Sequence, residues 1–270
     1  MDRGGSRDRQ IQGSSVRGFE ASERAFFAGY YAEQRYHPTG WRLRLERDVR
    51  VLCAAAPSGR LGRVLSVGCG DGAFELMLAP RAESVVGVDL SPEAIEVAQR
   101  AQARAGVRNV EFRCLSLADL AVTERFDTFV CLAFLHHLPA AVLAEFFGTA
   151  YACLEPGGLY YSQDPNRHGL LRLVGRRLLG RRYDTYHSAD ERELDPAEIV
   201  TALSATGFTG ISVRYIDLTL IPLLFMLVRG PDAVFRLCRA VDRLWCASPL
   251  ARWASGFAVV ARKPVAVRVG

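Results

Sequence analysis

The sequence contains almost no lysine. Lys263 is the only one in 270 residues, and arginine supplies nearly all of the positive charge, for a formal net charge of +5 at pH 7. A domain that holds nucleic acid usually concentrates Lys and Arg on one face, so a charge this modest argues against a nucleic-acid partner. One local basic cluster stands out, formed by Arg167, Arg172, Arg176, Arg177, Arg181 and Arg182.

Three further features are missing. The seven cysteines include no Cys-x-x-Cys pair and are odd in number, which argues against a structural zinc site and a disulfide framework. Residues 1–15 lack the apolar segment of a signal peptide. The longest apolar run, 218–228, is too short to span a bilayer and contains a proline. We therefore expect a cytoplasmic protein with no metal and no transmembrane segment.

The order of patterns along the chain predicts five segments. We expect a disordered tail over 1–18, an aromatic-rich N-terminal helical lid over 19–57, and a cofactor-binding core over 58–165. A basic, loop-like insertion over 166–194, with one short helix at 170–179, would form a substrate lid. The C-terminal half of the core would follow over 195–265, with a helical insertion at 219–254.

Strand and helix patterns alternate between residues 63 and 165. Apolar strand-like runs are followed by helical runs with clear ends, such as the helix that Ser91 and Pro92 begin and Gly106 ends. Asp195 and Glu198 have the spacing of a capping box, and apolar residues recur with helical period over 232–246. Alternation of this kind predicts an α/β fold with a doubly wound, mostly parallel sheet.

The motif that carries the chemistry is the segment Val-Leu-Ser-Val-Gly-Cys-Gly-Asp-Gly at 64–72. An apolar strand enters a glycine-rich turn that opens a helix, and Asp89 ends the next strand. Glycine suits a turn with positive φ or a backbone that a ligand approaches closely. An acid placed like Asp89 accepts hydrogen bonds from the ribose hydroxyls of a nucleoside cofactor.

This segment resembles the first motif of class I S-adenosylmethionine-dependent methyltransferases. The glycine spacing differs from the Gly-x-Gly-x-x-Gly of dinucleotide sites, and Asp71 would repel a pyrophosphate but suits a cationic ligand. The segments at 124–138 and 154–158 resemble two later motifs of the same family. The resemblance implies a Rossmann-like, seven-stranded sheet with helices on both faces and an antiparallel last strand. It also implies S-adenosyl-L-methionine as the cofactor.

Carried onto this sequence, the resemblance implies a set of cofactor-binding residues. They are Gly68, Cys69, Gly70, Gly72, Asp89, Leu90, Ser116, Leu117, Leu132 and Ala133. Ser116 stands where the family usually has an aspartate that binds the adenine amino group. Its hydroxyl can still make that bond, as can the backbone amide of Leu117, and Asp119 is a less favoured substitute.

Methyl transfer requires a positioned acceptor and often a base that removes its proton. His137, which matches the second histidine of the family's pair, is the favoured base. His136 and Asp164 are the other two candidates, and all three follow strands at the edge where open α/β sheets bind ligands. His136 could instead simply face the sheet, and Asp164 could form a turn before Pro165.

The acceptor itself leaves a weaker signal. We expect Tyr31 and Tyr36 from the N-terminal helices, and His168, Tyr183 and His187 from the basic insertion, to line its pocket. The alternatives are core packing for the aromatic residues and a solvated loop for the insertion.

The predicted function is methyl transfer to an O, N or C atom of a small organic acceptor, such as a bacterial secondary or lipid-type metabolite. Two alternatives remain: a macromolecular (RNA or protein) methyltransferase, and a non-methylating member of the fold that acts as a pericyclase-like catalyst or binding module. The sequence also leaves open whether the protein is a monomer or a homodimer. Residues 218–250 could be a lid, a dimer face or a peripheral membrane element.

Overall fold

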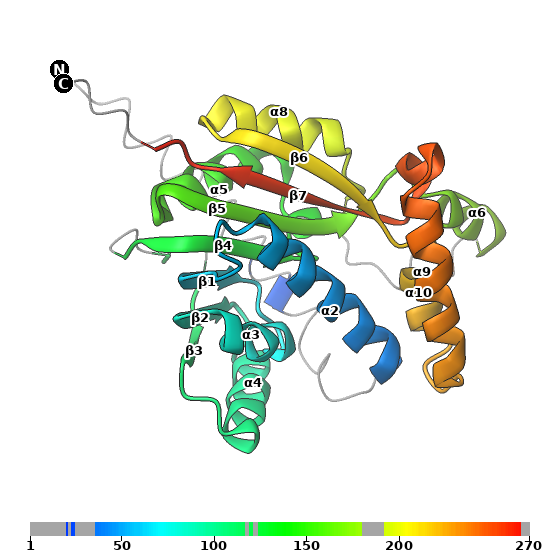
Figure 1. The fold of residues 1–270 in the computed structure, drawn as a ribbon, viewed down its shortest axis with the longest axis horizontal. Helices are drawn as coiled ribbons and strands as arrows, with labels where there is room; N and C mark the ends of the chain where they lie inside the picture. The colour runs from blue at the N-terminus through cyan, green and yellow to red at the C-terminus, as the bar shows by residue number, and fades with distance from the viewer. Residues whose placement is uncertain are drawn as a thin grey trace.

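A single seven-stranded sheet organises the molecule, as the computed structural model shows (Figure 1). The structure describes residues 20, 23–24, 36–116, 119–120, 124–179 and 192–265. The strands, in chain order, are β1 Arg63–Val67, β2 Ser84–Asp89, β3 Val110–Cys114, β4 Phe126–Leu132, β5 Leu154–Pro165, β6 Thr209–Ile216 and β7 Gly256–Arg262. Their spatial order is β3-β2-β1-β4-β5-β7-β6. The first five strands are parallel to one another, and β7 is antiparallel to both of its neighbours.

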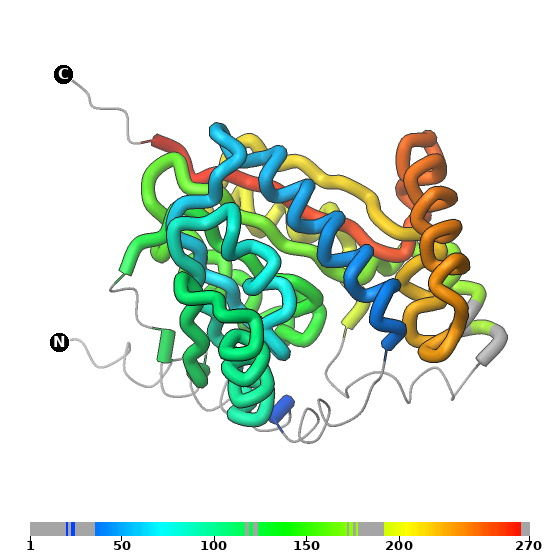
Figure 2. Tube along the Cα trace, turned by 60° about the horizontal axis from the view of Figure 1, so that its bottom comes forward, coloured from blue at the N-terminus to red at the C-terminus, as the bar shows by residue number. Residues whose placement is uncertain are grey.

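Helices cover both faces of this sheet and create two apolar cores (Figures 1 and 2). On one face lie α2 Pro38–Ala55, α3 Ala73–Leu78 and α4 Pro92–Ala105, whose core includes Leu52, Leu78 and Ile95. On the other face lie α5 Ala140–Cys153 and α8 Pro196–Thr206. The doubly wound α/β fold with an antiparallel last strand, predicted from the sequence, is therefore confirmed.

Local sequence signals explain where several helices begin and end. Ser91 caps α4 by accepting a hydrogen bond from the Ala94 amide, and Gly106 ends that helix in a left-handed conformation. Asp195 caps α8 through the Ala197 amide. The second half of the predicted capping box does not appear among the described contacts, because the Glu198 carboxylate accepts a hydrogen bond from Arg192 at 2.6 Å.

A helical block stands at one end of the sheet (Figure 1). It contains α6 Leu170–Leu179, α9 Leu220–Met226, α10 Asp232–Cys246 and the 3-10 turn η4 Pro249–Trp253. Within the described residues, no helix is both long and apolar enough to cross a membrane. Of the predicted N-terminal helices, α2 falls in the described part of the chain, whereas the predicted tail over 1–18 lies outside it. The segment boundaries remain predictions.

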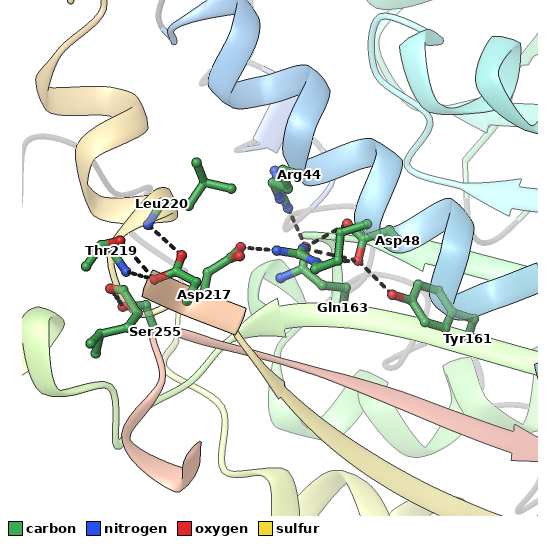
Figure 3. Close-up of polar contacts among 11 residues, drawn as sticks. Arg44, Asp48, Tyr161, Gln163, Asp217, Thr219, Leu220 and Ser255 are labelled. Atoms are coloured by element: carbon green, nitrogen blue, oxygen red, sulfur yellow. Dashed lines mark hydrogen bonds and ion pairs between the residues drawn. The ribbon is translucent and has the colours of Figure 1, made fainter. Parts of the chain in front are cut away.

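Helix α2 joins the sheet to this block through buried polar groups (Figure 3). The Asp48 carboxylate accepts hydrogen bonds from the Tyr161 hydroxyl of β5 at 2.7 Å and from Arg47 at 3.0 and 3.1 Å. Arg47 also pairs with Asp217, the residue after β6. Farther along, Asp242 of α10 caps α9 by accepting the Thr219 and Leu220 amides. Because charge removed from water must be paired, these contacts specify where α2 sits.

Candidate active site

The glycine turn between β1 and α3 has the conformation that its sequence predicts. Gly68, Gly70 and Gly72 have φ values of 72°, 54° and 75°, in the region that favours glycine. A Cβ at Gly68 would lie 2.5 Å from the ring of Phe134, and one at Gly72 would lie 2.5 Å from the ring of Phe112. A side chain at either position would have to displace an aromatic ring, so both positions require glycine and the backbone of the turn stays accessible.

Asp89 ties this turn to the end of β2. One carboxylate oxygen accepts a hydrogen bond from the Gly70 amide at 2.8 Å, and the other accepts one from the Ser91 amide at 2.9 Å. Burial raises the pKa of Asp89, while these backbone donors act in the opposite direction. The carboxylate is held in place, and each oxygen retains capacity to accept a further hydrogen bond.

The end of β4 carries a second special conformation. Ala133 has a φ of 49°, which is uncommon for a residue with a side chain, and its amide donates to the Gln163 carbonyl at 2.6 Å. Leu132 pairs with Gln163 in the parallel ladder of β4 and β5. The chain therefore turns sharply at 133, beside Phe134, whose ring covers Gly68. This places the ends of β1, β4 and β5 at one locality.

Two histidine–carboxylate pairs follow directly in the 3-10 turn η3 Leu135–His137. His136 Nδ1 lies 2.9 Å from Asp164 Oδ1, and the same oxygen accepts the His136 amide at 3.2 Å. His137 Nδ1 lies 3.0 Å from Glu23 Oε2. The rings of His136 and His137 have centroids 4.1 Å apart and planes tilted by 38°. Burial raises the pKa of Asp164 well above its usual range. Asp164 is fully buried near the end of β5, where one of its oxygens contacts both the ring and the amide of His136 in η3.

A buried arginine of α2 faces the same locality. Arg44 is only 5% exposed, and its guanidinium donates to the side chain of Gln163. None of the described carboxylates lies within ion-pair distance of it, and its Nε has no hydrogen-bond partner there. Burial lowers the pKa of Arg44, opposed mainly by the charge of Asp48. Among the described residues, a neutral amide and an aromatic face are the recorded neighbours of this cation, which is an unusual and costly arrangement for a buried charge.

A line of stacked groups connects Arg44 to the glycine turn. The guanidinium lies over the Trp41 ring at 4.6 Å, and Trp41 stacks on Tyr36 with centroids 4.3 Å apart. The Tyr36 hydroxyl donates to Asp71 Oδ2 at 2.8 Å. Tyr36, predicted to line the acceptor pocket, therefore also contacts the glycine-turn motif. Arg44 and the turn lie at the two ends of one contact chain.

Beneath the turn lies a carboxyl group that the sequence analysis did not single out. Glu75, in the first turn of α3, is 1% exposed and accepts a hydrogen bond from the Ser66 hydroxyl at 2.6 Å. Burial raises the pKa of Glu75 to about 8, so its carboxyl is largely protonated at neutral pH.

The remaining predicted site residues differ in burial and in their contacts, and some lie outside the described residues. The Cys69 side chain is buried under the turn, where burial raises the pKa of its thiol well above the usual range. Leu90 and Ser116 are half-buried, and the Ser116 hydroxyl donates to Asp119 at 3.0 Å. His168 is exposed and lies 3.0 Å from Asp195, which also caps α8. Tyr31, Leu117, Tyr183 and His187 lie outside the described residues.

Sequence reasoning missed Arg44, Gln163 and Glu23. Arg44 and its partner Gln163 are 119 residues apart, and no local pattern distinguishes Arg44 from the other arginines of α2. One available signal was the position of Gln163 beside Asp164 at the carboxyl end of a strand, where ligands bind in open α/β sheets. Glu23 gave no comparable signal.

Comparisons with known proteins agree with this geometry. Residues 64–158 match a family described as a methyltransferase domain. A ubiquinone biosynthesis O-methyltransferase from Xanthomonas euvesicatoria is 32% identical over 152 residues, which make up 54% of this chain and 62% of that protein. The match thus spans under two thirds of that relative's length.

Solved structures share the fold at low identity. The magnesium protoporphyrin IX methyltransferase from Synechocystis, solved with bound S-adenosylhomocysteine, has a TM-score of 0.57 and 19% identity, covering 83% of this chain and 84% of its own. The [4+2]-cyclase SpnF has a TM-score of 0.55 and 21% identity, covering 81% and 80%. These likenesses establish the architecture alone, since one neighbour is a methyltransferase and the other a cyclase.

Proposed function

Since this chain resembles class I S-adenosylmethionine-dependent methyltransferases in its family match and its fold, we propose that it transfers a methyl group from S-adenosylmethionine to a hydroxyl oxygen of a small organic acceptor. One observation carries the proposal. The glycine turn fixed by Asp89 and the buried guanidinium of Arg44 lie at the two ends of one contact chain.

The residues present fit the two ends of this cofactor. Asp89, with both oxygens positioned by backbone amides, suits the ribose hydroxyls. Arg44, a buried cation without a carboxylate partner among the described residues, suits the carboxylate of the methionine part. Between them, the bare backbone of Gly68 and Gly70 allows close approach. When bound, S-adenosylmethionine supplies an electrophilic methyl group on a sulfonium.

The acceptor's proton requires a base, and we assign this role to His137. Its imidazole is paired with Glu23, and it follows Phe134, whose ring contacts the glycine turn, in the same short segment. The imidazole would take the proton of the acceptor hydroxyl, while the bound cofactor would supply the methyl group and keep the electron pair of the broken S–C bond, leaving as S-adenosylhomocysteine. The pair of His136 and Asp164 would fix the η3 turn that presents His137.

The choice of an oxygen acceptor rests on two supports. The relative from Xanthomonas is named as an O-methyltransferase, and a hydroxyl group is the acceptor for which a nearby histidine base is most useful. Helix α2, which carries Arg44 and packs against α9 and α10, borders the site, and such a helical border suits a small molecule. Catalysis in the cytoplasm, as the cysteine pattern suggests, remains part of the proposal.

The deciding experiment separates cofactor binding from methyl transfer. Calorimetry should detect S-adenosylhomocysteine binding to the wild type and a loss of about 30-fold or more in Asp89→Ala, since two charge-assisted bonds disappear. Label from methyl-labelled cofactor should then enter hydroxylated acceptors, with amines and carbon acids tested alongside. Binding without transfer to any acceptor would favour the cyclase-like alternative. Failure to bind would refute the proposal.

A further inference from the structure

The outward face of α10 carries an apolar stripe that nothing in the described structure covers. Leu237, Val241 and Leu244 are 66%, 40% and 77% exposed. They are spaced four and three residues apart, so they lie on one side of the helix. Single exposed leucines are ordinary on protein surfaces, but three aligned over two turns form a contiguous patch, which usually marks a site of interaction.

This stripe is not the face by which α10 packs on the protein. Phe235, Cys238 and Asp242 are buried on the inward side, against α2 and α9. His37 at the start of α2 adds a firm attachment, because its ring stacks on Phe235 at 4.0 Å and its Nε2 lies 2.8 Å from the Gly230 carbonyl. Helix α10 therefore packs on the protein through one apolar face and presents a second apolar face to the outside.

Positive charge flanks the exposed stripe. Arg236 and Arg243 are exposed on α10. The two acidic residues of this helix, Asp232 and Asp242, interact with other groups and do not neutralise these arginines. Asp242 is buried as the cap of α9, and Asp232 accepts a hydrogen bond from Thr39 at the start of the helix. Burial lowers the pKa of nearby Arg50, and the charges of Arg239 and Arg243 lower it further. Among the residues that the structure describes, no carboxylate pairs with Arg236 or Arg243, so the outward face carries a net positive charge.

The neighbouring η4 turn adds an aromatic group to the same end of the molecule. Trp253 is 37% exposed, and the Arg252 guanidinium lies over its ring at 4.7 Å. The turn packs against α10. An apolar helical stripe bordered by arginine, with a partly exposed tryptophan beside it, has the composition of a helix that lies in the headgroup region of a membrane.

We propose that the outward face of α10, with η4, is a docking surface for an anionic lipid bilayer. Leu237, Val241 and Leu244 would enter the acyl boundary, and Arg236 and Arg243 would meet the lipid phosphates. This inference stands apart from the proposed chemistry, since it uses none of the residues of the glycine turn or η3.

A second copy of the chain fits this face less well. If two α10 helices packed antiparallel with Leu237 against Leu244, the same symmetry would place Arg236 of one opposite Arg243 of the other. Like charges facing each other across an interface are unfavourable, and α10 presents no outward carboxylate to relieve them. An anionic bilayer offers phosphates to the arginines and an apolar interior to the leucines, so both kinds of residue find a partner.

The test is flotation of the full-length protein with vesicles. We expect binding to mixed phosphatidylglycerol and phosphatidylcholine vesicles, and little to phosphatidylcholine alone. Arg236→Gln with Arg243→Gln should weaken binding by roughly 25-fold, at about fivefold per arginine, and added salt should mimic that loss. Leu237→Ser with Leu244→Ser should weaken it by about tenfold or more.

Matched controls come from other exposed positions. Arg100→Gln with Arg104→Gln changes two arginines that are also exposed, on α4, which lies away from α10 (Figure 1). Val265→Ser changes an aliphatic residue that is 70% exposed and lies beside Gly157 at the start of β5. They should leave flotation unchanged, and all variants should keep the wild-type circular dichroism spectrum. The proposal is overturned if the wild type does not bind anionic vesicles, or if the control variants lose as much binding as the α10 variants. It is also overturned if sedimentation shows a dimer that Leu237→Ser with Leu244→Ser dissociates.

Discussion

Glu75 shows how one buried residue can make stability depend on pH. Burial raises the pKa of its carboxyl from 4.5 to about 8, so the folded state keeps a proton that the unfolded state releases. The contribution of protonated Glu75 to stability is therefore fully present below its pKa in the unfolded chain, and it is lost as the pH rises towards 8.

Glu75→Gln should remove this loss, because the amide stays neutral and can still accept the Ser66 hydrogen bond. The free energy of unfolding of the variant, relative to the wild type, should rise by about 1 kcal/mol per pH unit between pH 5 and 8 and level off above that. Urea titrations at several pH values measure it. A difference that does not change with pH would contradict the assignment.

His137 should affect turnover far more than cofactor binding. His137→Ala should lower kcat by about 100-fold, the usual minimum for a lost general base, with the dissociation constant of S-adenosylhomocysteine changed by at most about threefold. Arg104→Ala is the control, since that side chain is exposed on α4 and has no assigned role in the site. Undiminished kcat in His137→Ala would remove this histidine from the base role.

Arg44 should discriminate between ligands with and without a carboxylate. Arg44→Met should weaken S-adenosylmethionine binding by about 10- to 100-fold, the usual range for a charged hydrogen bond, but should hardly affect decarboxylated S-adenosylmethionine. Arg42→Met, on the same helix but exposed, should change neither affinity. Calorimetry with both ligands provides the comparison. Equal losses for the two ligands would show that Arg44 acts only on the shape of the site.

Helix α2 is the element whose placement depends most on buried charge. Asp48→Asn removes the anion that Arg47 and Tyr161 share, leaving Arg47 with Asp217 alone. We expect a loss of about 3 kcal/mol in the free energy of unfolding, because a buried pair loses one partner. Glu46→Gln is the matched control, since its partly exposed pairs with Arg42 and Arg239 should contribute under about 1 kcal/mol. Similar losses in the two variants would contradict this account.

The elements that the sequence predicted well are those whose signals are local. The turn at 68–72, the cap at Ser91 and the amphipathic helix 232–246 each follow from residues within a few positions of one another. The network that seats α2 gave no such signal, because Asp48 and Tyr161 are 113 residues apart. Electrostatic pairs between distant segments depend on the folded arrangement, so pattern and spacing do not reveal them. The roles assigned to His136, His137 and Asp164 remain predictions.

At the scale of the whole molecule, cofactor binding should stabilise the fold. A ligand at about 100 times its dissociation constant adds about 2.7 kcal/mol to the free energy of unfolding. For a protein of this size, that corresponds to a rise in Tm of roughly 5–10 °C with S-adenosylhomocysteine. Differential scanning fluorimetry measures it, and Asp89→Ala, with affinity lowered about 30-fold or more, should show about a third of that rise or less at the same ligand concentration. An equal rise in that variant would place the ligand elsewhere.

The position of β7 has a consequence for how the chain is made. This strand is the last of the seven in sequence, yet it lies between β5 and β6 and forms hydrogen bonds with both. During translation, the edge of β5 must stay unpaired until residues 256–262 leave the ribosome, and β6 has no place in the sheet until then. Interrupted synthesis just before this point would release a nascent chain with an open, adhesive β-edge, a natural substrate for chaperones and proteases.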